Sequence, residues 1–198
     1  MVNPVNEALF RGAERSFWHL RARGADRVGI VWSGRKRLFD FGLDEKGMAR
    51  RNAGIIAPQE RVLPSGHVLR RFVGTNAFSR FGKAAALGHW WIDEPTWSLL
   101  KDHARQHRMT LEQTAQNYLA LPDEWGDRGR IAFGRVLKPV MAWSGTGEVA
   151  LGEDGQRYTP AQHNKAQQLF IPAVDGTFDQ AFGLAGVQCI YTRDEGRR

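Results

Sequence analysis

The sequence has one cysteine, no long apolar segment and no signal-peptide pattern. Its single cysteine, Cys189, lies in the apolar run GVQCIYT, where we expect a buried, unreactive thiol. One cysteine excludes disulfides within the chain. No stretch approaches the roughly 18 consecutive apolar residues of a membrane span. Because the opening MVNPVNEALF lacks a basic segment followed by an apolar one, we expect action in the cytoplasm. Delivery there by a specialised secretion system would need no signal peptide.

Several catalytic motifs are also missing. No G-x-x-x-x-G-K-[ST] loop and no helix-opening G-x-G-x-x-G is present to hold phosphates. Ser144 stands in WSGTG rather than in G-x-S-x-G, so a hydrolase elbow has no support. His103 and His107 have the spacing of metal ligands, but the intervening ARQ lacks the glutamate of a zinc-protease helix. We therefore expect both histidines on a solvated helix face, and chemistry without a metal or a thiol.

Positive charge outweighs negative charge. The 198 residues contain 28 Lys or Arg against 21 Asp or Glu, which gives a formal net charge of +7. The first 51 residues hold eleven Lys or Arg and six Asp or Glu, so about +5 of the net charge belongs to this quarter. Such a field attracts nucleic acid, an anionic membrane surface or an acidic protein. We expect the basic region to lie away from the catalytic cleft.

The N-terminal part predicts a helix and a hairpin. Apolar residues recur every three to four positions from Asn6 to about Arg23, which is typical of an amphipathic helix. The β-prone runs 27–32 and 37–41 flank SGRK and predict a hairpin. The residues 44–65 that follow are polar, with little periodicity, and are interpreted as a loop.

This loop suggests a boundary between two domains. Residues 1–62 are expected to form a basic annex of helix and hairpin, and residues 63–198 a second, larger domain.

The central region predicts a strand followed by two helices. VLRRFV (68–73) is β-prone, and Asp93 before Pro95 predicts a capped helix to about His107. Thr110 and Gln113 have capping-box spacing, which predicts a second helix over about 111–120. The last third predicts strands at 130–137, 139–143, 168–172 and 186–192. Strands separated by long loops after one helical region favour an α+β fold with a mainly antiparallel sheet.

Side chains alternate between the two faces of a strand, so neighbouring Arg and Trp residues should have different surroundings. Arg71 shares a face with Leu69 and Val73, so it should be partly desolvated and should have an anionic partner, either a protein carboxylate or a bound phosphate. Trp90 and Trp91 should likewise face opposite sides of a strand. We expect at most one of them in a ligand pocket, with the other packed in the core.

Several short segments occur along the chain in a characteristic order. The chain carries VLRRFVG, LGHWWIDEP, YLALPDEW, GRIAFGRV, a W-S-G-T-G turn and QQLFIP. This order resembles bacterial NAD-consuming toxin domains of the ADP-ribosyltransferase fold, and especially the tuberculosis necrotizing toxin group and related polymorphic-toxin domains. The resemblance covers about residues 66–174 and leaves 1–62 unexplained.

The resemblance implies a split, mainly antiparallel sheet that grips NAD in a cleft, so residues 63–198 are expected to form an NAD-binding catalytic domain. It places Arg71 on the cofactor phosphates and Trp90, with Gly88 before it, on nicotinamide and ribose. It places Gln168 on the ribose, with Gln167 as the alternative if the register shifts by one residue. An arginine in LFRGAE, Arg11, is a second candidate for the phosphate role.

The implied chemistry is cleavage of the nicotinamide N-glycosidic bond of NAD. Its oxocarbenium-like transition state calls for positioning groups and dipoles rather than for a nucleophile. In the resembling families that transfer ADP-ribose to a macromolecule, a Glu commonly stands where this chain has Gln168. The Gln therefore favours water as acceptor, which means NAD glycohydrolase activity. The alternatives are an ADP-ribosyltransferase with a nucleic-acid or protein acceptor, and a non-catalytic nucleic-acid-binding or interaction domain. An acidic immunity or antitoxin protein is the expected partner.

Overall fold

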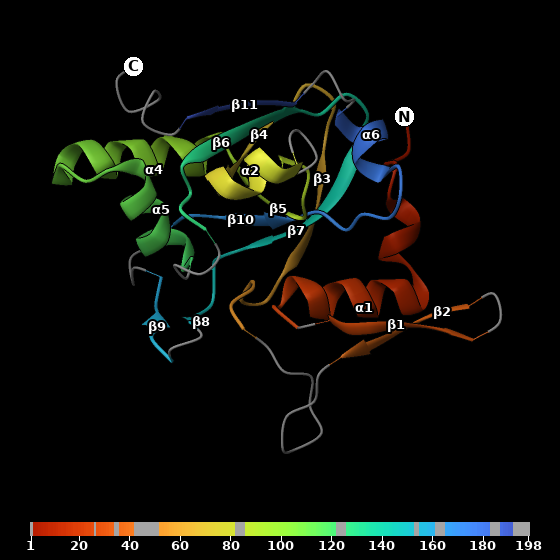
Figure 1. Cartoon of the computed structure of the whole chain (residues 1–198). Helices are drawn as coiled ribbons and strands as arrows, with labels where there is room; N and C mark the ends of the chain where they lie inside the picture. The colour runs from red at the N-terminus through yellow and green to blue at the C-terminus, as the bar shows by residue number, and fades with distance from the viewer. Residues whose placement is uncertain are drawn as a thin grey trace.

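The fold is built on one seven-stranded sheet with helices on both faces (Figure 1). The computed structural model describes residues 2–25, 27–33, 36–41, 52–81, 86–121, 126–152, 155–160, 165–182 and 187–191. The strands are β1 (Arg27–Ser33), β2 (Lys36–Phe41), β3 (Gln59–Leu63), β4 (Val68–Val73), β5 (Trp90–Asp93), β6 (Arg130–Arg135), β7 (Val140–Gly145), β8 (Ala150–Leu151), β9 (Arg157–Tyr158), β10 (Gln168–Phe170) and β11 (Val187–Tyr191). The helices are η1 (Glu7–Phe10, a 3₁₀ turn), α1 (Gly12–Ala22), α2 (Thr75–Phe81), α4 (Glu94–His107), α5 (Leu111–Leu119) and α6 (Thr177–Phe182).

The strand order in the large sheet is β11-β6-β4-β5-β10-β7-β3. Every pairing between the described strands is antiparallel. The predicted α+β class with a mainly antiparallel sheet is therefore confirmed. The hairpin of β1 and β2 is also confirmed, and it stands apart from the large sheet as a two-stranded unit.

The two faces of the sheet bury different clusters. On one face, Trp91 and Leu169 pack in the same core as Phe182 of α6. The other face is shared by two helical groups. α4 and α5 cover one part of it, in a cluster that includes Ile92, and η1 with α1 covers another part, around Trp143 and Phe170. Figure 1 shows these two groups well separated, with α1 below the sheet and α4 and α5 on its left.

Local capping fixes where the central helices start. Asp93 caps α4 by accepting a hydrogen bond from the Thr96 backbone N–H at 3.3 Å. Thr110 and Gln113 form the predicted capping box at the start of α5, with bonds of 3.0 and 3.2 Å. Both predicted helices are confirmed.

The N-terminal helix differs from the prediction. The expected continuous helix over 6–23 is interrupted because Arg11 adopts an extended backbone, with φ −126° and ψ 149°. The break lets η1 and α1 turn separately onto one cluster. Phe10 stacks on Trp143 at 5.1 Å between ring centroids, while Trp18 lies 6.2 Å from Phe170.

A strand was also missed between residues 44 and 65. β3 lies at an edge of the sheet, beside β7, and only Leu63 of its five residues is buried. Since such an edge strand needs little apolar periodicity, no pattern indicated it. The proposed boundary at 62/63 falls inside β3. Residues on both sides of it pack together, because the Asn6 amide donates to the carbonyls of Met141 and Pro172, each at 2.9 Å. The division into two domains stays a prediction.

Three short elements had no prediction, namely α2, the β8–β9 hairpin and α6. Cys189 pairs with Ala132 across β11 and β6, but its predicted burial lies outside the described side chains. No helix in the described part of the chain is both long and apolar enough to span a membrane.

Candidate functional site

The sheet opens between β4 and β5. These strands pair only at Leu69 with Asp93 and at Arg70 with Ile92, although β4 continues to Val73. Beyond the second pair the strands part, and the cavity described below reaches the ends of both.

The cavity has a volume of about 370 Å³, within the range of roughly 300–1,000 Å³ seen for small-molecule sites. It lies between the two helical groups. Its described lining consists of Arg21, Gly24, Asn52, Ala53, Gly54, Arg70, Arg71, Phe72, Gly74, Trp90, Trp91, Ile92, Leu119, Leu121, Arg128 and Gln168. Three residues singled out in the sequence, Arg71, Trp90 and Gln168, thus border the same cavity from three different strands.

The parted strands explain how these three residues meet. In a continuous sheet, Arg71 would lie on the face of Trp91, whereas Trp90 and Gln168 would lie on the face of Ile92. The register pairs Gln168 with Ile92 and Leu169 with Trp91, in agreement with that alternation. Because the strands separate beyond Arg70, one cavity reaches residues of both faces.

Gly88 makes room for the Arg71 side chain. A Cβ atom added at Gly88 would lie only 1.6 Å from Nη1 of Arg71. The Arg71 guanidinium also lies 6.0 Å from the Trp91 ring centroid, within cation–π range. The Trp91 indole N–H in turn donates to the Gly88 carbonyl at 2.6 Å. Gly88 therefore contributes space rather than a functional group.

The Gln168 side chain is closely surrounded, as that of Arg71 is. Its side chain is buried, with 9% exposed, and its Nε2 donates to the Leu119 carbonyl at 3.0 Å. A Cβ at Gly147, in the W-S-G-T-G turn, would lie 2.5 Å from Nε2. The bond to Leu119 fixes the plane of the amide and leaves Oε1 as its acceptor atom.

The tryptophan pair corrects an expectation. Both Trp90 and Trp91 border the cavity, although one was expected to lie wholly in the core. Trp91 is only 2% exposed and packs against Phe182, with ring centroids 5.0 Å apart. Trp90 is half-buried and meets Phe170 edge-on at 4.9 Å. Trp90 is accordingly the more accessible aromatic ring at the cavity.

Four arginines border the cavity, and none of its described lining residues is acidic. Arg21 comes from α1, Arg70 and Arg71 from β4, and Arg128 from the loop before β6. Arg70 is paired with Glu94 and lies 5.1 Å from the Trp97 ring centroid, so part of its charge is engaged within the protein. The lining is strongly electropositive and suits an anionic ligand.

The other candidates lie elsewhere. Arg11 has a side chain that is 72% exposed and pairs with Glu7 four residues earlier, and it does not border the cavity. Gln167 does not border it either, and its backbone exchanges hydrogen bonds with the Thr96 hydroxyl.

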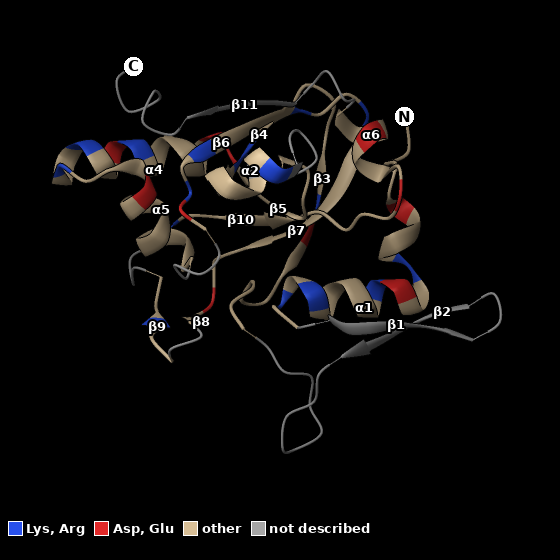
Figure 2. Ribbon diagram, viewed as in Figure 1, with Lys and Arg blue, Asp and Glu red and all other residues tan. Residues whose placement is uncertain are grey.

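The N-terminal quarter contributes to the site, so the expectation that it lies away from the cleft is wrong. α1 brings Arg21 to the cavity, and residues 52–54 form part of the wall. Gly24 and Gly54 allow these segments to cross closely, since a Cβ at Gly24 would lie 2.3 Å from the Ala53 carbonyl oxygen. The glycines and the Arg-rich helix face were visible in the sequence, but nothing in it indicated this crossing. Figure 2 shows the basic residues spread over α1, α2 and α4.

The two histidines of α4 contact each other, and one of them contacts Tyr118. His103 lies with Nδ1 2.7 Å from the Tyr118 hydroxyl, and its ring is 4.1 Å from that of His107. Burial and then the charge of His107 lower the pKa of His103 below its ordinary value. Among the described residues, no group of three or more His, Cys, Asp or Glu could hold a metal ion.

Comparisons with known proteins find partial likenesses in structure. A chain from the structure of Tne2 in complex with Tni2 matches with a TM-score of 0.42 and 14% identity, over 67% of this chain and 87% of that chain. A chain from the structure of Rhs1-CT in complex with its cognate immunity protein RhsI1 matches with a TM-score of 0.41 and 15% identity, over 68% and 78%. No protein-family model and no curated protein matches the chain.

Proposed function

We propose that this chain is an NAD glycohydrolase that acts as a toxin by consuming NAD. The observation that carries the proposal is the cavity in which Arg71, Trp90 and Gln168 meet, bordered by four arginines. The sequence resemblance over about residues 66–174 points to the same activity.

The lining suits the three parts of the substrate. Guanidinium groups pair with phosphate oxygens in charge-assisted hydrogen bonds, so Arg71 binds the pyrophosphate. Trp90 offers a flat aromatic surface to the nicotinamide ring. The amide of Gln168, fixed by Leu119, presents Oε1 to the ribose hydroxyls.

The reaction needs no nucleophile from the protein. The bond between ribose C1′ and the nicotinamide nitrogen breaks, and its electron pair neutralises the positively charged pyridinium ring. Positive charge then develops on the ribose, as it does in glycoside cleavage. Water adds to C1′ and releases a proton to solvent, so the products are nicotinamide, ADP-ribose and H⁺. Positioning the pyrophosphate and the ribose lowers the barrier through orientation.

The lining favours water over a macromolecular acceptor. A transferase activates its acceptor with a carboxylate, and the described lining holds Gln168 in place of one, with no Asp or Glu. NAD hydrolysis is thus the better fit. An acidic immunity protein that covers this basic cavity would silence the toxin, by complementary charge.

The test uses NAD labelled in its adenylate half, incubated with the purified chain alone and with RNA, DNA or cell extract. We expect free labelled ADP-ribose at the same rate in every mixture. Label that appears on a polymer, only when an acceptor is added, would indicate a transferase. Salt-sensitive binding of polynucleotides without any NAD turnover would indicate a non-catalytic binding domain.

A further inference from the structure

The loop 126–129 brings an arginine to the cavity that the sequence did not single out. Arg128 borders the cavity, and its Nη1 donates to the carbonyl of Leu121 at 3.3 Å. Leu121 follows α5 and borders the same cavity. Arg128 therefore joins the lining from beside the end of α5, whereas Arg21 comes from α1.

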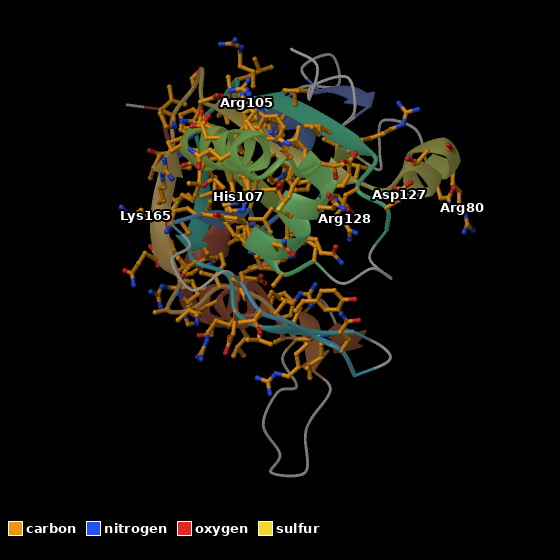
Figure 3. All side chains as sticks on the ribbon, turned by 90° about the vertical axis from the view of Figure 1, so that its left-hand side faces the viewer. Arg80, Arg105, His107, Asp127, Arg128 and Lys165 are labelled. Carbon is orange, nitrogen blue, oxygen red and sulfur yellow. The ribbon has the colours of Figure 1, made fainter. Side chains whose placement is uncertain are left out.

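Asp127 ties this loop to the start of α2. Its Oδ1 accepts the backbone N–H of Thr75 at 2.7 Å and that of Gly129 at 3.1 Å. Burial raises the pKa of Asp127, but these hydrogen bonds outweigh it and hold the pKa below its ordinary value. Asp127 itself does not border the cavity. Figure 3 shows Asp127 on the side of α2 and Arg128 closer to α5.

Glycines allow the loop to approach closely. A Cβ at Gly129 would lie 2.5 Å from the Thr75 hydroxyl, and a Cβ at Gly126 would lie 3.3 Å from Cα of Gly74. Gly74 directly follows β4 and also borders the cavity. The loop is therefore packed against the strand that carries Arg71.

Arg128 has an unfavourable backbone conformation. Its φ of 52° lies in the left-handed region, which is sterically unfavourable for a residue with a Cβ atom. Such a conformation persists only where the surroundings impose it, and it is concentrated at functional sites. Glycine or asparagine would adopt it more easily. An arginine at this position is therefore not explained by the backbone.

We propose that Arg128 is a further anion-binding residue of the cavity, and that Asp127 positions it by holding the loop 126–129 against α2. This inference rests on the proposed function in one respect, namely that the cavity binds a substrate with phosphate groups. Arg128 contacts that substrate from the α5 side, while Arg71 contacts it from β4. Asp127 acts only through Arg128.

Binding measurements test Arg128 without requiring turnover. The probes are ADP-ribose and inorganic pyrophosphate, titrated calorimetrically into the purified full chain. Arg128→Asn should weaken ADP-ribose binding about tenfold, because a charge-assisted hydrogen bond is lost. Its melting temperature should change little, since Asn tolerates the left-handed backbone and this offsets the lost hydrogen bond to Leu121. Arg128→Lys should retain part of the affinity.

Two substitutions of Asp127 separate its positioning role from its charge. Asp127→Asn keeps an oxygen that accepts both N–H groups, and we expect near-normal affinity. Asp127→Ala removes the acceptor and should weaken binding about three- to fivefold. In the Arg128→Asn background, Asp127→Ala should cause no further loss, because the two residues act as one unit.

The outcomes distinguish this inference from the proposed function. Binding of ADP-ribose that depends on Arg128, without cleavage of NAD, would support the inference and overturn the function. Cleavage of NAD with unchanged ADP-ribose affinity in Arg128→Asn would overturn the inference alone. No binding of either probe to the wild-type chain would also overturn it.

Discussion

The guanidinium of Arg71 occupies the space that a side chain on Gly88 would need. Nη1 of Arg71 would lie 1.6 Å from a Cβ at that position. Because the contact involves the far end of a flexible side chain, a methyl group could be accommodated by moving Arg71 alone. Gly88 thus governs where the charge of Arg71 lies.

Gly88→Ala should therefore reduce activity with little effect on folding. We expect a ten- to hundredfold decrease in kcat/KM for NAD, roughly what loss of a hydrogen bond to a charged group would give. The melting temperature should change by only about 2–4 °C. The measurement is nicotinamide release together with thermal unfolding.

The double variant provides the control for Gly88. Once Arg71→Ala has removed the guanidinium, adding Gly88→Ala should have no further effect on kcat/KM. Additive losses would mean that Gly88 acts independently of Arg71.

Gly147 should have the same relationship to Gln168. A Cβ at Gly147 would lie 2.5 Å from the Gln168 amide nitrogen, so Gly147→Ala should turn the amide away from Leu119. We expect an activity as low as that of Gln168→Ala. Near-normal kcat/KM in Gly147→Ala would show that the orientation of this amide is unimportant.

The contacts of Gly88 and Gly147 show which features of the site could be predicted from the sequence and which could not. The segments LGHWW and W-S-G-T-G marked Gly88 and the turn that holds Gly147, but the reason for each glycine is the side chain that lies against it. The partners Arg71 and Gln168 are 17 and 21 residues away. Periodicity and capping describe neighbours within a few positions, so they predicted most strands of the large sheet and the helices α4 and α5, but not β3. They carry no information on contacts at this separation.

The rest of the cavity lining also depends on contacts that local sequence patterns do not predict. Arg21 and residues 52–54 reach the site because α1 packs on Trp143 and Phe170, far along the chain. Arg128 reaches it because Asp127 bonds to Thr75, 52 residues earlier. These are tertiary contacts between segments far apart in the sequence, for which no local pattern exists.

The stability of the chain should depend on the protonation of His103. Its folded-state pKa lies below the ordinary value of 6.5, through burial and the charge of His107. The folded state therefore favours neutral His103, and this contribution is present above about pH 6.5. It is lost as the pH falls through the folded-state pKa. The melting temperature should decrease from pH 7 to pH 5, and His103→Gln should reduce the decrease.

His19 and His67 also have lowered pKa values, mainly through burial, so the variant should retain part of the effect. An identical pH dependence in wild type and His103→Gln would contradict this assignment.

NAD glycohydrolase activity is tested most directly by measuring the release of nicotinamide from NAD by the purified wild-type chain, beside Arg71→Ala and Gln168→Ala variants of unchanged melting temperature. We predict release by the wild-type chain without an added acceptor, and a decrease of at least about tenfold in each variant. No release by the wild-type chain, or equal rates in all three proteins, would contradict it.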